Sequence, residues 1–429
     1  MSDYTRRAIP IAEAQRLIAA HARPLRTERV PLLAAFGRRL AEPLVADRPV
    51  PAFARSGMDG YAVRAADLAE ASPARPARLA VAQATVASGG TAPPQPVSPG
   101  EAARIMTGAP LPAGADAVVM LESVREEATG ALRQAVFARP VAAGLNVTPV
   151  GGEIAPGAAV LAPGVRIGPG AAALLASFGR TEPLTYARPR VAIVTTGSEV
   201  IAPEETPGYG QIRNSNLAML RGLAEDAGAE VVFAAHADDD EERIARAIRI
   251  AFEEAGADAV LTSGGVSVGD FDLTGRLLGR EGRTLLFNKI SMRPGSVTSA
   301  AVQDGKPLFG LSGNPSACYV GFALLVRPAL ARMGGHPEFG LPSYSAYLGE
   351  DYPKGGAFPR YLRGRTSVER AVVRVTPCSG NRSSDILSIQ EADCLIVIPP
   401  CPRGLPAGTL VEAIPLASRG DGYRGGERT

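Results

Sequence analysis

Hydrophobic residues near the N-terminus are spaced at the period of a helix. Residues 11–21 and 31–42 carry apolar side chains three or four positions apart, which predicts two amphipathic helices. In the second segment the apolar positions form a stripe that we expect to be buried, and it consists of Leu32, Leu33, Phe36 and Leu40. The chain is therefore expected to begin with a helical part.

A different pattern follows between about residues 49 and 150. Short apolar runs, many containing Val, alternate there with Pro and with Gly turns, which predicts a small β-rich module. Pro and Gly also punctuate residues 151–170. Residues 171–179 then predict a short helix that Gly179 ends.

Residues 189–335 repeat one unit, an apolar run followed by a loop and then by helical spacing. The apolar runs begin at Val191, Val231, Ala257 and Pro307, and the clearest helix is expected over residues 241–255. Strands that alternate with helices predict a parallel, doubly wound sheet. Ligands of such sheets bind beyond the carboxyl ends of the strands, where three of these runs meet Gly-rich turns.

Beyond about residue 342 the pattern favours strands again. The clearest predicted strands cover residues 368–376, 394–399 and 410–415. The last twelve residues, 418–429, are polar and rich in glycine, and we expect them to be disordered. The sequence thus predicts a multidomain chain of α/β and β parts.

Composition narrows the class of protein without assigning a function. A chain of 429 residues is long enough for several domains. The formal net charge of +2 argues against a nucleic-acid partner, and no apolar run is long enough to span a membrane. The N-terminus lacks the apolar segment of a signal peptide, so we expect a cytoplasmic protein. The four cysteines lack zinc-site spacing and are expected to be reduced thiols, and the scattered histidines argue against a histidine-centred triad.

The most informative segment is the Gly-rich run 262–272. Its small residues follow an apolar strand, so backbone N–H groups can approach an oxyanion, and the candidates to bind it are Ser263, Gly264, Gly265 and Ser267. Asp270 and Asp272 follow at once. Two carboxylates beside an anion site require a cation between them, which indicates a divalent metal. The alternative is a tight connection without a ligand.

Further carboxylates lie at the expected sheet edge. Glu199 follows a strand end, and Asp238 begins a run of three aspartates. Carboxylates that converge on one edge favour Mg²⁺. For the aspartate run, the competing interpretation is a cap and acidic first turn of the helix that follows, and we consider it the better one. For Glu199 the competing interpretation is a solvated loop carboxylate.

Cationic and polar residues would complete an anion site. Lys289 and Arg293 lie four positions apart, although they could equally be exposed loop cations. Ser312, Gly313 and Asn314 begin a helix whose N-terminus could hold a phosphate, or form a plain cap.

Read together, these segments resemble the molybdopterin molybdenumtransferase family, which includes bacterial MoeA and the E domain of gephyrin. The resemblance runs from about residue 9 to residue 415, and seven motifs in the order of the family carry it: Ser56-Gly-Met-Asp-Gly-Tyr-Ala-Val, Arg104-Ile-Met-Thr-Gly-Ala-Pro, Thr195-Thr-Gly-Ser-Glu, Asn214-Ser-Asn, Ser263-Gly-Gly-Val-Ser-Val-Gly-Asp, Arg293-Pro-Gly and Gly310-Leu-Ser-Gly-Asn-Pro.

The resemblance implies a division into four parts and a tail. A discontinuous helical part would comprise residues 9–48 and 151–188 and would be interrupted by a β-rich domain at 49–150. A molybdopterin-binding α/β domain would follow at 189–338, and a C-terminal β-barrel at 342–417. The tail would be residues 418–429.

The resemblance also implies a reaction and its partners. Molybdate would be inserted into adenylylated molybdopterin with release of AMP, in a Mg²⁺-dependent step that yields molybdenum cofactor. The protein would be a homodimer whose subunits share the active site. Molybdopterin adenylyltransferase and molybdoenzyme apo-proteins or their chaperones are further candidate partners.

By the same resemblance, individual residues take roles. Asp59 and Thr107 match functional positions that act from the partner subunit, although an Asp-Gly pair is by itself more often a hairpin turn. Three carboxylates match positions tied to activity and are the candidate metal ligands, namely Glu199, Asp238 and Asp272. Together with Lys289 and Arg293 these residues form the candidate catalytic set. Arg363 and Ser384 match substrate-binding positions.

Departures from the family pattern concern the anion site. Many members have Lys-Pro-Gly-Lys-Pro, whereas this chain has Arg293-Pro-Gly-Ser-Val, so that Ser296 replaces a cation. Glu153 stands where aspartate is common, and Thr148 where arginine is frequent. These changes leave the choice between molybdate and tungstate open. Two alternative functions also remain, a molybdopterin adenylyltransferase and a non-catalytic scaffold that binds the cofactor.

Overall fold

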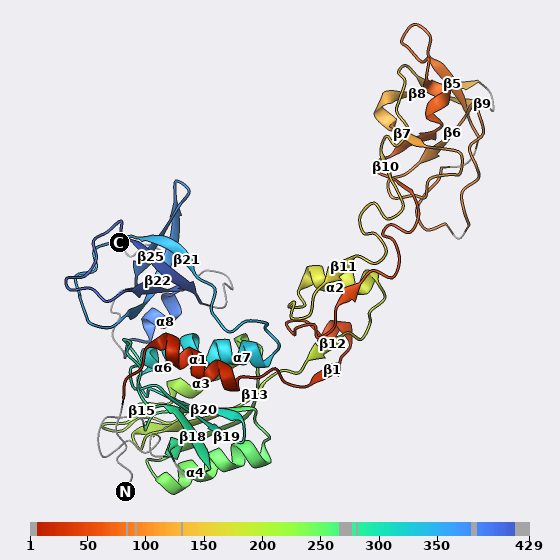
Figure 1. The fold of residues 1–429 in the computed structure, drawn as a ribbon. Helices are drawn as coiled ribbons and strands as arrows, with labels where there is room; N and C mark the ends of the chain where they lie inside the picture. Colours follow the sequence, from red (N-terminus) through yellow and green to blue (C-terminus); the bar gives the residue numbers. More distant parts are fainter. Residues whose placement is uncertain are drawn as a thin grey trace. The chain divides into compact units, whose positions relative to one another are not determined.

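The chain forms two compact units. The computed structural model describes residues 7–82, 85–90, 92–129, 132–265, 277–279, 282–378 and 384–416. The larger unit comprises Met1–Glu42, Pro163–Ala173 and Arg180–Thr429, and the smaller one Pro43–Ala162 and Leu174–Gly179 (Figure 1). No helix in the described part of the chain is both long and apolar enough to cross a membrane.

A six-stranded sheet in the order β16-β13-β17-β20-β19-β18 forms the centre of the larger unit. Its strands are β13 (Arg190–Thr196), β16 (Glu230–Ala237), β17 (Ala259–Ser263), β18 (Arg283–Phe287), β19 (Ser299–Gln303) and β20 (Lys306–Leu311). The four strands β16, β13, β17 and β20 are parallel, as the apolar runs predict. The last two strands, β19 and β18, add an antiparallel edge that the pattern did not predict.

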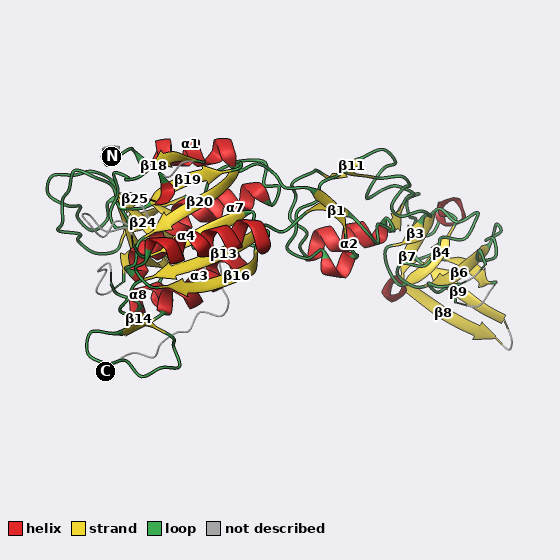
Figure 2. Cartoon of the chain, turned by 90° about the horizontal axis from the view of Figure 1, so that it is seen from below, coloured by secondary structure: helices red, strands yellow, loops and turns green. Residues whose placement is uncertain are grey.

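Helices cover both faces of this sheet (Figures 1 and 2). The helices are α1 (Ile11–His21), α3 (Ser215–Asp226), α4 (Glu241–Arg249), α6 (Pro315–Gly321) and α7 (Arg327–Met333), with π-helical turns at Ile250–Glu254 and Phe322–Val326. Alternate residues of β13 enter two separate cores, Ile193 with α1, α3, α6 and α7, and Val194 with α4. Because both faces are covered, the central strands are continuously apolar.

The predicted helix over residues 31–42 is wrong. Only a 3-10 turn forms, at Leu32–Ala34, and Leu33 is 85% exposed. Gly37 has φ +81°, and Leu40 bridges to Thr185 on β12 (Leu184–Tyr186). A tertiary pairing therefore replaces the helix, and of the predicted stripe only Leu40 is fully buried.

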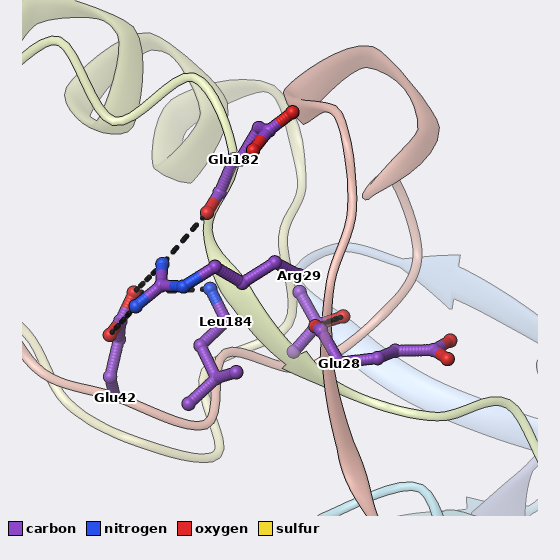
Figure 3. Close-up of polar contacts among 6 residues, drawn as sticks. Glu28, Arg29, Glu42, Glu182 and Leu184 are labelled. Atoms are coloured by element: carbon purple, nitrogen blue, oxygen red, sulfur yellow. Dashed lines mark hydrogen bonds and ion pairs between the residues drawn. The ribbon is translucent and has the colours of Figure 1, made fainter.

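Charged side chains hold residues 27–42 against strand β12. Strand β1 (Thr27–Arg29) pairs antiparallel with β12, and Arg29 contacts Glu42 at 3.2 Å (Figure 3). Partial burial raises the pKa of Glu42, but hydrogen bonds from the Leu184 N–H and from Arg29 outweigh it and lower the pKa. Glu28 points away from this pair and forms an ion pair with Arg38.

The smaller unit is rich in strands, as predicted for residues 49–150. Its six-stranded sheet has the order β7-β4-β6-β5-β9-β8 and is joined by two short strand pairs, β2–β11 and β3–β10. The strands are β2 (Leu44–Val45), β3 (Arg55–Ser56), β4 (Gly60–Val63), β5 (Ala77–Val81), β6 (Glu101–Ile105), β7 (Ala117–Met120), β8 (Val124–Thr129), β9 (Leu132–Phe137), β10 (Val147–Thr148) and β11 (Ala159–Leu161), with 3-10 turns at Ala65–Leu68 and Leu121–Ser123. Helix α2 (Pro169–Ser177) is followed by Gly179 at φ +67°, close to the predicted helix.

The C-terminal strands close a barrel in the order β21-β23-β22-β24-β25, which confirms the predicted barrel. Its elements are β21 (Tyr344–Leu348), β22 (Arg360–Glu369), β23 (Val372–Pro377), helix α8 (Leu387–Glu391), β24 (Cys394–Ile398) and β25 (Leu410–Pro415). The predicted strand over residues 368–376 is wrong, because a hairpin turn at Arg370 and Ala371, both with positive φ, divides it. All four cysteines are free thiols, as expected. The tail, residues 418–429, lies outside the described residues.

Candidate functional site

Three glycine turns meet at the carboxyl edge of the parallel strands. Gly264 follows β17 with φ +100°, and a Cβ there would lie 2.4 Å from the carbonyl oxygen of Thr196. A Cβ at Gly313, in the turn after β20, would lie 3.5 Å from the Cα of Gly264. Backbone thus packs directly on backbone, and side chains are kept out of this edge. Gly265, also at positive φ, continues the same turn.

Asn216 ties these turns together, although sequence reasoning did not select it. It lies in the first turn of α3, and its Nδ2 donates to Ser263 Oγ at 2.9 Å and to the Gly313 carbonyl at 2.8 Å. Ser263 Oγ in turn donates to the Ser312 carbonyl at 3.1 Å. Asn214 caps α3 through Leu217 N–H at 3.1 Å. The signal was present in the Asn214-Ser-Asn motif.

Two buried polar atoms at this edge have no hydrogen-bond partner in the described part of the chain. They are Thr196 Oγ1 and Asn216 Oδ1. Leaving a buried polar group unpaired costs about 1–3 kcal/mol. Native structures rarely retain such groups unless a ligand or water pairs with them. Their position beside Gly264 therefore indicates a polar ligand site.

The nearby thiol is not a nucleophile. Cys318 Sγ lies 3.7 Å from Ser263 Oγ, and burial raises the pKa of Cys318 to about 12. At neutral pH this thiol is therefore protonated, and only thiolates react readily. Cys318 is therefore not a candidate nucleophile of this site.

The three aspartates of the run 238–240 make different contacts. Asp240 caps α4 by accepting from Arg243 N–H at 2.9 Å, which confirms the cap interpretation for that residue. Asp238 forms an ion pair of 2.6 Å with Arg243, while Asp239 accepts the Ser198 N–H at 3.1 Å. Glu199 is exposed beside Gly197. Among the described residues, Glu199 is thus the carboxylate of this group whose side chain has no hydrogen bond or ion pair.

No group of three or more His, Cys, Asp or Glu side chains able to hold a metal occurs among the residues described. Three predicted site residues, Ser267, Asp270 and Asp272, lie outside them.

The segment carrying Lys289 and Arg293 also lies at the carboxyl edge. It connects β18 to β19, and Ser299, which begins β19, pairs with Gly310 near the end of β20. Its backbone is fixed to the barrel, because Arg293 N–H donates to Pro359 at 3.0 Å. The Arg293 side chain is exposed, whereas Lys289 is half-buried. Both cations are therefore at the sheet edge where an oxyanion is expected.

In the smaller unit, Asp59 and Thr107 are brought together. Asp59 Oδ1 accepts hydrogen bonds from the backbone N–H and from Oγ1 of Thr107, each at 2.7 Å. These two bonds, helped by the charge of Arg104, lower the pKa of Asp59. Gly60 is required next to it, because a Cβ there would lie 2.0 Å from the Val119 carbonyl oxygen. Because β3 pairs with β10 and β4 with β6 and β7, Asp59 does not lie in a hairpin turn, and its exposed carboxylate has a lowered pKa.

The barrel contributes a buried arginine. Arg363 is only 1% exposed, and its Nε donates to Ser388 Oγ at 2.7 Å. Burial lowers the pKa of Arg363. The Ser316 hydroxyl, at the start of α6, donates to the Asp385 carbonyl at 2.6 Å and joins this barrel loop to the α/β sheet. Ser384 lies in an exposed turn beside it.

Fold and candidate site together describe a multidomain protein with unpartnered polar atoms at the carboxyl edge of an α/β sheet, and comparisons with known proteins identify the family. Family models match the MoeA N-terminal region (domain I and II) over residues 9–179, a probable molybdopterin binding domain over 192–332 and the MoeA C-terminal region (domain IV) over 345–416. The chain belongs to the MoeA family of molybdopterin molybdenumtransferases.

Individual relatives agree with this assignment over nearly the whole chain. The molybdopterin molybdenumtransferase of Staphylococcus aureus is 39% identical over 95% of this chain and 96% of its own length. That of Bacillus subtilis is 37% identical over 95% and 94%. The crystal structure of a molybdopterin biosynthesis MoeA protein from Pyrococcus horikoshii superposes with a TM-score of 0.79, at 29% identity, over 96% of this chain and 100% of that one.

Proposed function

We propose that this protein inserts molybdate into adenylylated molybdopterin, with release of AMP, to form molybdenum cofactor. The observation that carries the proposal is the pair of unpartnered buried atoms, Thr196 Oγ1 and Asn216 Oδ1, at a sheet edge from which glycines exclude side chains. Such an edge suits a flat, polar ligand with a phosphate group. The full-length similarity to proteins named molybdopterin molybdenumtransferase supports this function over that of an adenylyltransferase.

The charge and burial of each residue at this edge suggest its role. Ser263 and the glycine turns would orient the pterin and its phosphate through backbone and hydroxyl groups. Lys289 and Arg293 would attract molybdate, because both are cations beside the same edge. Arg363 is buried and bonded to Ser388, so it would act by positioning the loop that carries Ser384. Positioning of this kind accelerates a reaction between two bound substrates.

Magnesium is proposed as the metal. Mg²⁺ keeps several waters and often uses only one or two protein carboxylates, so the exposed Glu199 fits such a ligand without a cluster of three. Asp272 is proposed as a second ligand. Asp238 is a weaker choice because it already pairs with Arg243. When bound, the ion would neutralise charge on the phosphate of the departing AMP.

We further propose a homodimer in which Asp59 and Thr107 of one subunit complete the site of the other. The ionised, exposed Asp59 carboxylate supports this role, because it has the form needed to contact a cation or a donor group. Delivery of substrate by the adenylyltransferase, and transfer of product to molybdoenzyme apo-proteins or their chaperones, are expected further interactions.

The proposal is tested by incubating the purified protein with adenylylated molybdopterin, molybdate and Mg²⁺, and by measuring AMP and active cofactor. We expect both products from the unmodified chain and a near-complete loss for Asp59→Ala. Glu122→Ala, which removes another exposed carboxylate of the smaller unit, is the matched control and should remain active. A folded protein that binds substrate but releases no AMP would instead be a scaffold, and the enzymatic proposal would be wrong. Repeating the assay with tungstate addresses the choice of metal at Arg293 and Ser296.

The shared site is tested by mixing Asp59→Ala with Asn216→Ala at a substrate concentration at which neither variant releases AMP by itself. If each site uses residues from both subunits, each mixed dimer regains one intact site, and about one quarter of the original activity returns. If each site is formed by a single subunit, mixing restores nothing.

A further inference from the structure

A cavity of about 680 Å³ lies within the larger unit, at the edge of the sheet opposite the candidate site. Pro189, directly before β13, and Gly228, shortly before β16, line it. These positions are amino ends of parallel strands, whereas the candidate site is at carboxyl ends. Because β13 is seven residues long, roughly 20 Å separates the two edges. We call this hollow the amino-edge cavity.

Positive charge is concentrated in the amino-edge cavity. Five arginines from four segments of the chain line it, namely Arg38, Arg39, Arg166, Arg188 and Arg327. Among the described residues of its lining, Asp226 is the one carboxylate. Like charges gathered in a partly enclosed space repel one another more strongly than they do in water. The cavity therefore has an excess of positive charge that favours an anion.

Most of the contacts that hold these arginines do not neutralise them. Backbone carbonyl oxygens accept from three of them: Arg39 donates to Gly164 at 2.8 Å, Arg188 to Phe36 at 3.3 Å and Arg327 to Pro415 at 2.9 Å. Of the five, Arg38 alone forms an ion pair with a carboxylate in the part of the chain described, and its partner, Glu28, also contacts Arg26. The guanidinium groups are thus oriented in advance but keep most of their charge.

Two donor atoms of these arginines are buried beneath the cavity surface. Arg327 Nη2 and Arg38 Nε are buried and have no hydrogen-bond partner among the described residues. Burial lowers the pKa of Arg327, and burial together with the charge of Arg166 lowers the pKa of Arg39. Burial is the main cause for both arginines, because each charged group has lost water without gaining a counter-charge. An anion bound in the cavity would supply this counter-charge.

We propose that the amino-edge cavity binds a phosphorylated small molecule that carries a diphosphate group and is no larger than a nucleotide. Guanidinium groups pair with phosphate oxygens through two parallel hydrogen bonds, and several arginines match several negative charges. The volume lies within the usual range of ligand pockets. Tyr186 and Leu330 add an apolar wall for the remainder of such a molecule. This site is separate from the proposed catalytic site and does not depend on that function.

The test measures binding of inorganic pyrophosphate and of uridine diphosphate to the full-length protein by calorimetry, at constant ionic strength and without Mg²⁺. Arg166→Ala combined with Arg188→Ala removes two exposed cations from the wall without removing buried groups. Arg249→Ala, which removes an exposed arginine of α4, is the matched control. Lys289→Ala removes a cation from the carboxyl edge instead.

We expect pyrophosphate binding that persists in Lys289→Ala and therefore belongs to the amino-edge cavity, with a dissociation constant that rises roughly tenfold or more in the double variant. Arg249→Ala and Lys289→Ala should leave the constant unchanged. Tighter binding of uridine diphosphate would show that the apolar wall also contacts the ligand. Absence of pyrophosphate binding, equal binding by the double variant, or loss of binding in Lys289→Ala alone would each overturn the proposal. Because binding is the readout, the result is independent of catalytic activity.

Discussion

Replacing Gly264 by alanine tests the central feature of the candidate site. Its φ of +100° is a conformation that L-residues rarely adopt and that costs roughly 1–3 kcal/mol. In addition, the new Cβ would lie 2.4 Å from the Thr196 carbonyl oxygen and 2.7 Å from its Oγ1. Forcing extra volume into a packed site costs about another 1–3 kcal/mol. We therefore expect the α/β domain to lose roughly 2–6 kcal/mol of stability.

The matched control is Gly305→Ala. Gly305 lies in the turn between β19 and β20 with φ +77°, and a Cβ there would have nothing within 4 Å. Gly305→Ala therefore has the conformational cost of roughly 1–2 kcal/mol but no steric overlap. The difference between the two variants isolates the steric contribution.

Unfolding should be followed by calorimetry or circular dichroism, because the chain contains no tryptophan. A domain of this size loses roughly 2–4 °C in Tm per kcal/mol, so Gly264→Ala should unfold several degrees below Gly305→Ala. Release of AMP should fall sharply only in Gly264→Ala, because relief of the overlap must move the Thr196 backbone or the turn. Equal stability and equal activity in the two variants would refute the close-packing argument.

Three further predictions concern single groups. Asp59 should stay ionised as the pH falls through about 4, because its pKa is lowered. Any stability that the Asp59 carboxylate contributes is therefore lost only below that pH. Thr107→Val should raise the pKa of Asp59 in an NMR titration. Asn216→Ala should destabilise the protein by only about 1 kcal/mol but weaken substrate binding more, whereas an equal effect on both would argue for a structural role alone. Thiol labelling at pH 8 should modify Cys401 first. Burial raises the pKa of Cys318 and of Cys394 to about 12 and that of Cys378 to about 11, so these thiols stay protonated. Rapid labelling of a second thiol would contradict this order.

The apolar pattern predicted the α/β sheet well because its strands are covered on both faces. Strands β13, β17 and β20 are mainly apolar runs, each followed within two residues by a glycine, and they occur where the pattern placed them. The same pattern was misleading at residues 31–42, where helical spacing coincides with a segment that pairs with β12. It also missed the turn at Arg370 and Ala371, since neither residue type signals positive φ.

The sequence by itself determined the family, the order of the domains' main elements and the residue types at the sheet edge, because these depend on local spacing and on motifs. Only the tertiary structure decided which groups meet. It joined Asp59 to Thr107 across 48 positions and Asn216 to Gly313 across 97. It also gathered five arginines around one cavity. No local pattern encodes such pairings, because chain topology rather than sequence neighbourhood brings these side chains together.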